Sequence, residues 1–78
     1  MDITYSRARA VRIYQNPYSI DVRADVLFRN GKMAHYDWLN RSDRDKIHDV
    51  VDSDTTFYDE RAMDVGWENL CGFYGVEL

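Results

Sequence analysis

The chain is poor in the residues that build covalent links, metal sites and phosphate-binding loops. A single cysteine, Cys71, stands among 78 residues, so an intramolecular disulfide is excluded and the thiol is expected to pack as a small apolar group. The four glycines are too few for a glycine-rich phosphate loop. The two histidines, His35 and His48, have no second His or Cys at helical spacing to complete a metal site. We therefore expect no catalytic residue, no metal ion and no other cofactor, and predict that the protein is not an enzyme.

Long apolar runs are also missing. The longest apolar stretch spans only a few residues, far below the ~20 needed to cross a bilayer, and no basic segment followed by an apolar one opens the chain. The sequence predicts a cytoplasmic protein without membrane contact. Its 45% apolar and 14% aromatic content is too high for a disordered chain. A length of 78 residues gives room for a single domain, 1–78, with one core.

Hydrophobic alternation is clearest over residues 18–29. Apolar side chains occupy every even position and polar ones occupy most odd positions, which is the period of a strand with one buried face. Asn30-Gly31 follows directly and favours a two-residue type I′ turn. A hairpin with a second strand over 32–39 is therefore expected.

The length of this turn decides which side chains share a face. With a two-residue turn, Val26 faces His35 on the core side, so His35 is expected to be partly buried and hydrogen-bonded. Tyr36 and Trp38 then lie on the opposite face. An exposed aromatic pair marks an interface when nothing covers it. We therefore predict that Tyr36 and Trp38 are apolar anchors for a partner.

The N-terminal segment 3–14 permits two structures. Its apolar side chains change parity midway, which a β-bulge would accommodate, and Asn16-Pro17 would then turn the chain into the next strand. The alternative is a helix, because the Arg-Ala-Arg-Ala segment has good helix propensity. We favour the bulged strand.

Two helices are expected in the second half of the chain. Ser42 is a good N-cap for a helix over 43–52, which has acids in its first turn and an apolar stripe. A second helix is expected over 57–72, and the residues that signal its start lie near Asp54. Apolar side chains are expected around more than half of its circumference. The predicted fold is α+β, with both helices packed on one face of a three-stranded antiparallel sheet. The predicted strands are 3–14, 18–29 and 32–39.

Charge is divided unevenly along the chain. Residues 1–41 hold seven basic and four acidic residues, a net charge of +3, whereas residues 42–78 hold three basic and ten acidic residues, a net charge of −7. An ordered array of carboxylates is a recognition surface for a basic partner, whereas scattered charge mainly keeps a protein in solution.

The acids of the second half recur at helical spacing. At ~100° per residue they form stripes on the outer faces of the two predicted helices. Carboxylates on successive turns lie ~5–6 Å apart, comparable with phosphates that advance ~3.4 Å per nucleotide, so two stripes could imitate a nucleic-acid backbone. The alternative is that these acids only solvate the helices. The predicted partner-binding acids are Asp45, Asp49, Asp52, Glu60, Asp64 and Glu68.

With these two arrays and its compact sheet-and-helix layout, the short acidic chain resembles phage-encoded inhibitors of the anti-CRISPR and anti-restriction type. The resemblance involves no diagnostic motif. It implies a non-enzymatic, stoichiometric inhibitor, acting as a DNA mimic or in a related way, that presents an acidic helical surface to a basic protein or nucleoprotein complex such as a nuclease effector. If the chain is phage-encoded, its location would be the host cytoplasm.

Two other functions stay open. Basic side chains interleave with aromatic ones on the predicted strands, and this combination neutralises and stacks single-stranded nucleic acid. A small nucleic-acid-binding module is therefore the first alternative. The second is a self-associating, homodimeric structural domain, because halves of opposite charge attract each other between copies. The residues of the first alternative are Arg7, Arg9, Arg12, Arg23, Arg29, Lys32 and Arg41, with Tyr5, Tyr14, Tyr18, Tyr36 and Trp38.

Overall fold

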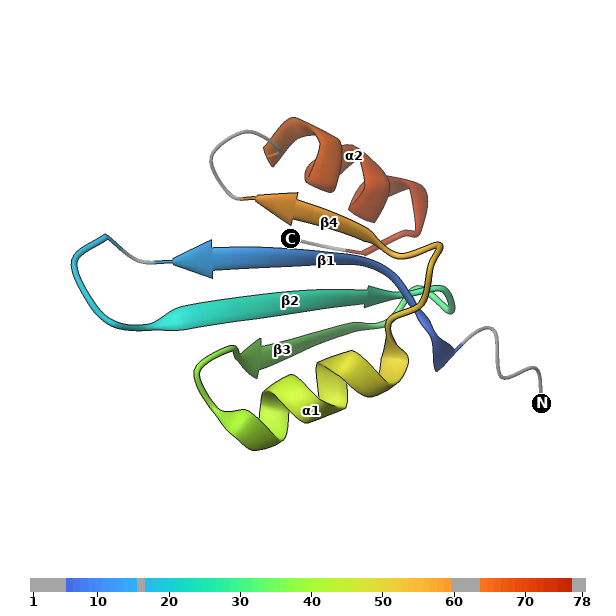
Figure 1. The fold of residues 1–78 in the computed structure, drawn as a ribbon. Helices are drawn as coiled ribbons and strands as arrows, with labels where there is room; N and C mark the ends of the chain where they lie inside the picture. The colour runs from blue at the N-terminus through green and yellow to red at the C-terminus, as the bar shows by residue number, and fades with distance from the viewer. Residues whose placement is uncertain (1–5, 16, 60–63, 77–78) are drawn as a thin grey trace.

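The fold is α+β, as predicted, and is built on one four-stranded sheet (Figure 1). The computed structural model describes residues 6–15, 17–59 and 64–76. The strand order is β3-β2-β1-β4, with β4 parallel to β1 and the other pairs antiparallel. The prediction of a three-stranded antiparallel sheet is wrong, because the sheet contains a fourth strand, β4. The elements in chain order are β1 (Ala8–Gln15), β2 (Val22–Phe28), β3 (Met33–Asp37), α1 (Arg41–Val50), β4 (Thr56–Asp59) and α2 (Asp64–Phe73).

Strand β4 forms where the sequence predicts the start of the helix 57–72. The segment Thr56–Asp59 is rich in β-branched and aromatic residues, which favour strands, and it pairs with β1. The Asp54 amide donates to Asp52 Oδ1 at 2.9 Å, and Thr55 Oγ1 donates to a β1 carbonyl at 2.8 Å. These residues close a turn instead of capping a helix, so α2 begins several residues later than predicted.

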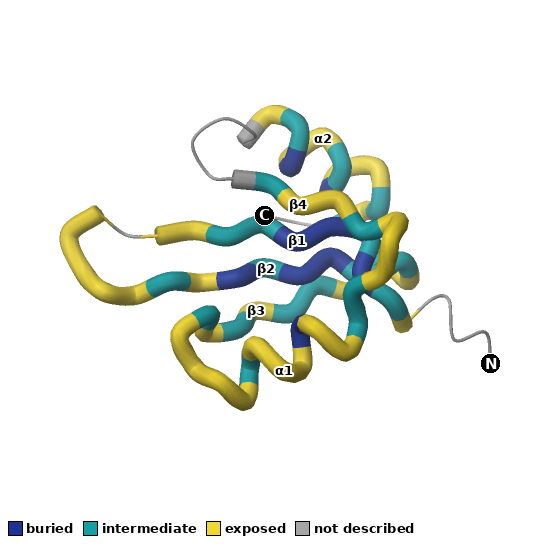
Figure 2. The backbone as a smooth tube through the Cα atoms, in the orientation of Figure 1, coloured by how far each residue is buried: buried dark blue, intermediate teal, exposed yellow. Residues whose placement is uncertain are grey.

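The two helices pack on opposite faces of the sheet. Neighbouring residues of a strand point to opposite faces. Ile47 of α1 packs with Val11 and Val26 on one face, whereas Trp67 of α2 packs with Leu27 on the other. Figure 2 shows that burial concentrates in β1 and β2, between the helices. The prediction that both helices cover one face is therefore wrong. Leu27, the one apolar residue at an odd position of β2, is buried on the second face.

The β2–β3 hairpin has a three-residue loop. Phe28 N–H donates to the Lys32 carbonyl at 2.9 Å, and Gly31 has a φ of 86°. This geometry is a turn that ends in a left-handed residue. The extra loop residue shifts the pairing by one position and moves each β3 side chain to the other face. His35 therefore pairs with Asp25, and not with Val26 as predicted.

Strand β1 carries the predicted bulge, between Ala8 and Ala10. The alternative helix is wrong for this segment. Residues 3–5 of the predicted strand lie outside the described residues.

The other strands are shorter than predicted. The strand expected over 18–29 begins only at Val22, because its partner β1 ends at Gln15, directly opposite. The alternating residues before Val22 therefore form a loop. The strand expected over 32–39 likewise spans only Met33–Asp37.

Helix α1 starts earlier than the predicted 43–52 because Asn40, and not Ser42, is its N-cap. The Asn40 side chain accepts a hydrogen bond from the Ser42 amide at 2.9 Å. Within the described residues, neither helix combines the length and the apolar content needed to cross a membrane.

Candidate functional site

The predicted stripe on α1 is reduced to two exposed carboxylates, Asp45 and Asp49. Asp52 lies beyond the helix, and its Oδ1 is 2.8 Å from Arg29 Nη2. Desolvation raises the pKa of the Asp52 carboxyl, but hydrogen bonds from the Asp54 amide and the Arg29 guanidinium outweigh it, so the pKa is lowered. Asp52 therefore contributes to the turn before β4 and to its link with the β2–β3 loop.

Helix α1 carries no net charge, because its sequence holds three basic and three acidic residues. Arg41 and Arg44 are exposed on the same helix as Asp45, and Lys46 Nζ lies 3.9 Å from Asp43 Oδ1. The outer face of α1 is therefore mixed in sign. The acidity of the second half comes from residues 51–78, which hold seven acidic residues and one basic residue.

The second predicted stripe is described only in part. Glu68 is exposed on α2, whereas Glu60 and the Asp64 side chain lie outside the described part of the structure. Since α1 and α2 pack on opposite faces of the sheet, the acids of the two helices do not share one surface.

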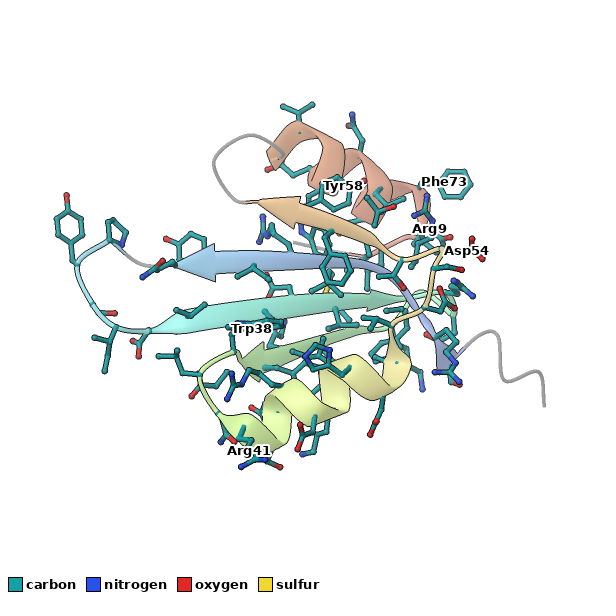
Figure 3. All side chains as sticks on the ribbon, in the orientation of Figure 1. Arg9, Trp38, Arg41, Asp54, Tyr58 and Phe73 are labelled. Carbon is teal, nitrogen blue, oxygen red and sulfur yellow. The ribbon has the colours of Figure 1, made fainter. Side chains whose placement is uncertain are left out.

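Tyr36 and Trp38 are half-buried and do not form an exposed pair. Both pack against the core cluster on the α1 side of the sheet. The Trp38 ring lies against the sheet (Figure 3), with its centroid 6.1 Å from that of the His48 ring. The one-residue register shift explains this placement, because it turns Tyr36 towards α1.

Three side chains form a polar row across the other face of the sheet. Asp25 Oδ2 accepts a hydrogen bond from Arg12 Nη2 at 3.1 Å, and Asp25 Oδ1 lies 2.6 Å from His35 Nδ1. The Asp25 side chain is only 14% exposed, so these two contacts stabilise a carboxylate with little access to water. The hydrogen bond expected of His35 is confirmed, but its expected burial is wrong, because the side chain is 72% exposed.

Arg12 joins this row to α2. Its guanidinium carbon lies 5.1 Å from the centroid of the Trp67 ring, a cation–π geometry. Tyr58 meets the same ring edge-on at 5.8 Å, between β4 and α2 (Figure 3). Trp67 is fully buried, and its Nε1 has no hydrogen-bond partner among the described residues. In the same cluster, burial raises the pKa of the Cys71 thiol.

Beyond Arg12, towards the β1–β2 loop, this face of the sheet is open. Tyr14 and Arg23 are both exposed there. Together with the polar row they line a shallow hollow of about 340 Å³. A neighbouring hollow of about 330 Å³ shares Arg23 and His35. We call the residues of the first hollow the open sheet face: Arg12, Tyr14, Arg23, Asp25 and His35.

The β1–β2 loop forms a second exposed feature. Tyr18 is 95% exposed and Ile20 is 82% exposed, although the sequence places both on a buried strand face. Trp38 N–H donates to the Val22 carbonyl at 2.8 Å, so Leu39, which is 53% exposed, lies near the base of this loop. Figure 2 shows the loop extending past both helices. We call Tyr18, Ile20 and Leu39 the hairpin-end surface.

The basic and aromatic residues that the sequence interleaves are largely separated in space. Arg12, Tyr14 and Arg23 come together on the open sheet face, whereas Arg29 is held by a carboxylate and Arg9 donates to a β4 hydroxyl at 3.2 Å. The contribution of His35 to this site depends on the register of β3, which places it beside Asp25. The sequence signal for this register is a three-residue loop that ends at Gly31.

Among the residues with described positions, no three His, Cys, Asp or Glu side chains are grouped so that they could hold a metal ion. Comparisons with protein-family models, curated proteins and solved structures find no match. The open sheet face and the hairpin-end surface are therefore the two features of the described structure that point to a function.

Proposed function

We propose that the protein acts without catalysis, by binding another protein in a fixed ratio through its hairpin-end surface. The observation that carries this proposal is the exposure of Tyr18 and Ile20, at 95% and 82%. The strands on either side of the loop pair as far as Gln15 and Val22. The apolar tip is thus held on a paired ladder that projects from the molecule (Figure 1).

Apolar side chains on such a tip favour contact with a partner. Burying one large apolar side chain contributes about 1.5–3 kcal/mol, and tyrosine is among the residues that dominate binding energy at protein interfaces. Leu39 widens the apolar area at the base of the loop. A groove that receives Tyr18 and Ile20 would therefore provide most of the affinity.

We further propose that the partner is basic, and that binding inhibits a nucleic-acid-binding protein such as a nuclease effector. The net charge of −4 favours approach of a positively charged protein. Asp45 is exposed on α1, the helix that follows Leu39, together with Arg41 and Arg44. The rim beside the apolar contact is therefore mixed in sign, and the attraction would come from the net charge of the whole protein. Occupation of the partner's surface is the proposed means of inhibition.

Site-specific photocrosslinking tests the proposal. A photoreactive phenylalanine analogue replaces Ile20 in one sample and Val65, which is 71% exposed on α2, in another. Both samples are irradiated in cells that naturally contain the protein. We expect one discrete adduct with a basic protein at position 20 and none at position 65. Adducts of equal yield at both positions would contradict the proposal.

The isolated partner then permits a matched comparison of affinities. The double variant Tyr18→Ser with Ile20→Ser should bind about 100-fold more weakly, because two buried apolar contacts are lost. Val65→Ser with Phe73→Ser is the control, since both residues are similarly exposed, at 71% and 84%. Unchanged affinity of the first variant would overturn the proposal. An adduct with a second copy of the chain would instead indicate self-association.

A further inference from the structure

The charges of the open sheet face are only partly neutralised within the protein. Both oxygens of Asp25 are engaged, by Arg12 and by His35. Arg23 forms no ion pair with a described residue. Its neighbour in register, Asp37, instead accepts a hydrogen bond from the Leu39 amide at 2.9 Å. The guanidinium of Arg23 is therefore available to an external anion.

The five residues of the open sheet face have a net charge opposite in sign to that of the whole protein. Two arginines and one aspartate give +1 with His35 neutral, whereas the chain carries −4. An arginine guanidinium matches the geometry of a phosphate and binds it with paired hydrogen bonds. Asp37 lies beside Arg23 and, with Asp21, lines the neighbouring hollow. The positive charge is therefore confined to the first hollow, where Arg23 is the group that can bind an anion.

Two further groups in the hollow can contact a ligand. Asp25 fixes the ring of His35 through Nδ1, so Nε2 lies on the far side of the imidazole from this carboxylate and can form a hydrogen bond. Tyr14 is 42% exposed and supplies an aromatic ring on which a base can stack. Tyr14 and Arg23 are direct neighbours across β1 and β2.

We propose that the open sheet face binds a nucleotide, with its phosphate on Arg23, its base on Tyr14 and a hydrogen bond to His35. The hollow of about 340 Å³ falls within the range of about 300–1,000 Å³ typical of small-molecule sites. The neighbouring hollow shares Arg23 and His35 but is also lined by Asp21 and Asp37, so it does not favour a second phosphate. The ligand of the first hollow is either a free nucleotide or one nucleotide of a single strand.

Isothermal titration calorimetry with adenosine monophosphate tests this site at low salt. We expect binding that Arg23→Gln weakens about tenfold, because a charge-assisted contact is lost. Arg44→Gln is the matched control, since it removes the same exposed charge from α1. Tyr14→Leu should weaken binding as well, whereas Tyr18→Leu, at the hairpin end, should not. Circular dichroism checks that each variant keeps the wild-type fold.

A comparison of a mononucleotide with a short oligonucleotide shows whether the phosphate comes from a free nucleotide or from a single strand. A short oligoadenylate that binds more tightly than the mononucleotide identifies a single strand as the ligand, and equal affinities identify a free nucleotide. Absence of binding by both, equal loss in Arg44→Gln, or tighter binding of a phosphotyrosine peptide would overturn the proposal. The variant Ile20→Ser should keep nucleotide binding, so failure of this proposal is distinguishable from failure of the protein-binding proposal.

Discussion

At the scale of single residues, Asp25 connects three strands through one carboxylate. It lies between Arg12 of β1 and His35 of β3, each its direct neighbour across the sheet. The Arg12 side chain is 23% exposed and the Asp25 side chain 14% exposed. Loss of the Asp25 charge would therefore remove a carboxylate from a partly buried guanidinium, which is costlier than the loss of a surface ion pair.

The variant Asp25→Asn should lower the free energy of unfolding by about 1–3 kcal/mol, since the hydrogen bonds it weakens involve charged groups. Urea denaturation at neutral pH measures this change. Asp45→Asn is the control, because Asp45 is exposed on α1, and its effect should stay within about 0.5 kcal/mol. Equal effects of the two substitutions would contradict the structural role of Asp25.

The pKa of Asp52 gives a prediction that depends on pH. Because this pKa is lowered in the folded protein, the unfolded state binds protons more readily, and the carboxylate stabilises the fold above its ordinary pKa. This stabilisation should be lost as the pH falls through the lowered value. The difference in unfolding free energy between wild type and Asp52→Asn should therefore disappear in acid. A difference that stays constant from neutral to strongly acidic pH would contradict the lowered pKa of Asp52 in the folded protein.

At the scale of elements, the β2–β3 loop depends on Gly31. Its φ is 86°, and a Cβ at this position would lie 3.2 Å from the Tyr74 carbonyl oxygen. Gly31→Ala should therefore destabilise the protein by at least about 1–2 kcal/mol, the cost of a left-handed conformation for a residue with a Cβ.

Gly72→Ala is the control for Gly31→Ala, because it is expected to change the stability in the opposite direction. Gly72 lies within α2, and a Cβ there would meet nothing within 4 Å. Gly72→Ala should stabilise the protein by about 0.5–1 kcal/mol, because alanine has the higher helix propensity. Thermal unfolding of both variants measures the two effects. If both substitutions stabilised the protein, or both destabilised it, the loop geometry would be contradicted.

The elements that local chemistry determines were predictable from the sequence. The α+β class, the bulge in β1 and the existence of α1 follow from parity and capping signals. Strand β4 was not predictable in this way, because residues 57–72 also have apolar spacing typical of a helix. Its pairing with β1 is a contact between distant parts of the chain, and such contacts override local propensity.

The candidate site was harder to predict than the fold. A two-residue and a three-residue loop after β2 differ by one residue, yet they place opposite sets of β3 side chains on a given face. This difference moved His35 to Asp25 and turned Tyr36 towards the core. The exposure of Tyr18 and Ile20 was also missed, because alternation continues into a loop that has no partner strand.

At the scale of the whole molecule, the placement of the two helices explains where the exposed features lie. The helices cover opposite faces of the sheet, and the β1–β2 hairpin extends past both of them (Figure 1). The open sheet face and the hairpin-end surface therefore lie towards the same end of the sheet. The nucleotide proposed for the first and the protein proposed for the second can be tested separately, because the variants for each involve different residues.

Shortening the hairpin tests the central claim, that its apolar end binds a partner protein. Gln15 and Val22 face each other across β1 and β2, so residues 16–21 can be replaced by Asn-Gly, which favours a tight turn between paired strands. The circular dichroism spectrum should stay unchanged. We then measure the affinity of this variant for the partner isolated by crosslinking at position 20. The account predicts a loss of at least about 100-fold relative to wild type, and a shortened protein that binds as tightly as wild type would contradict it.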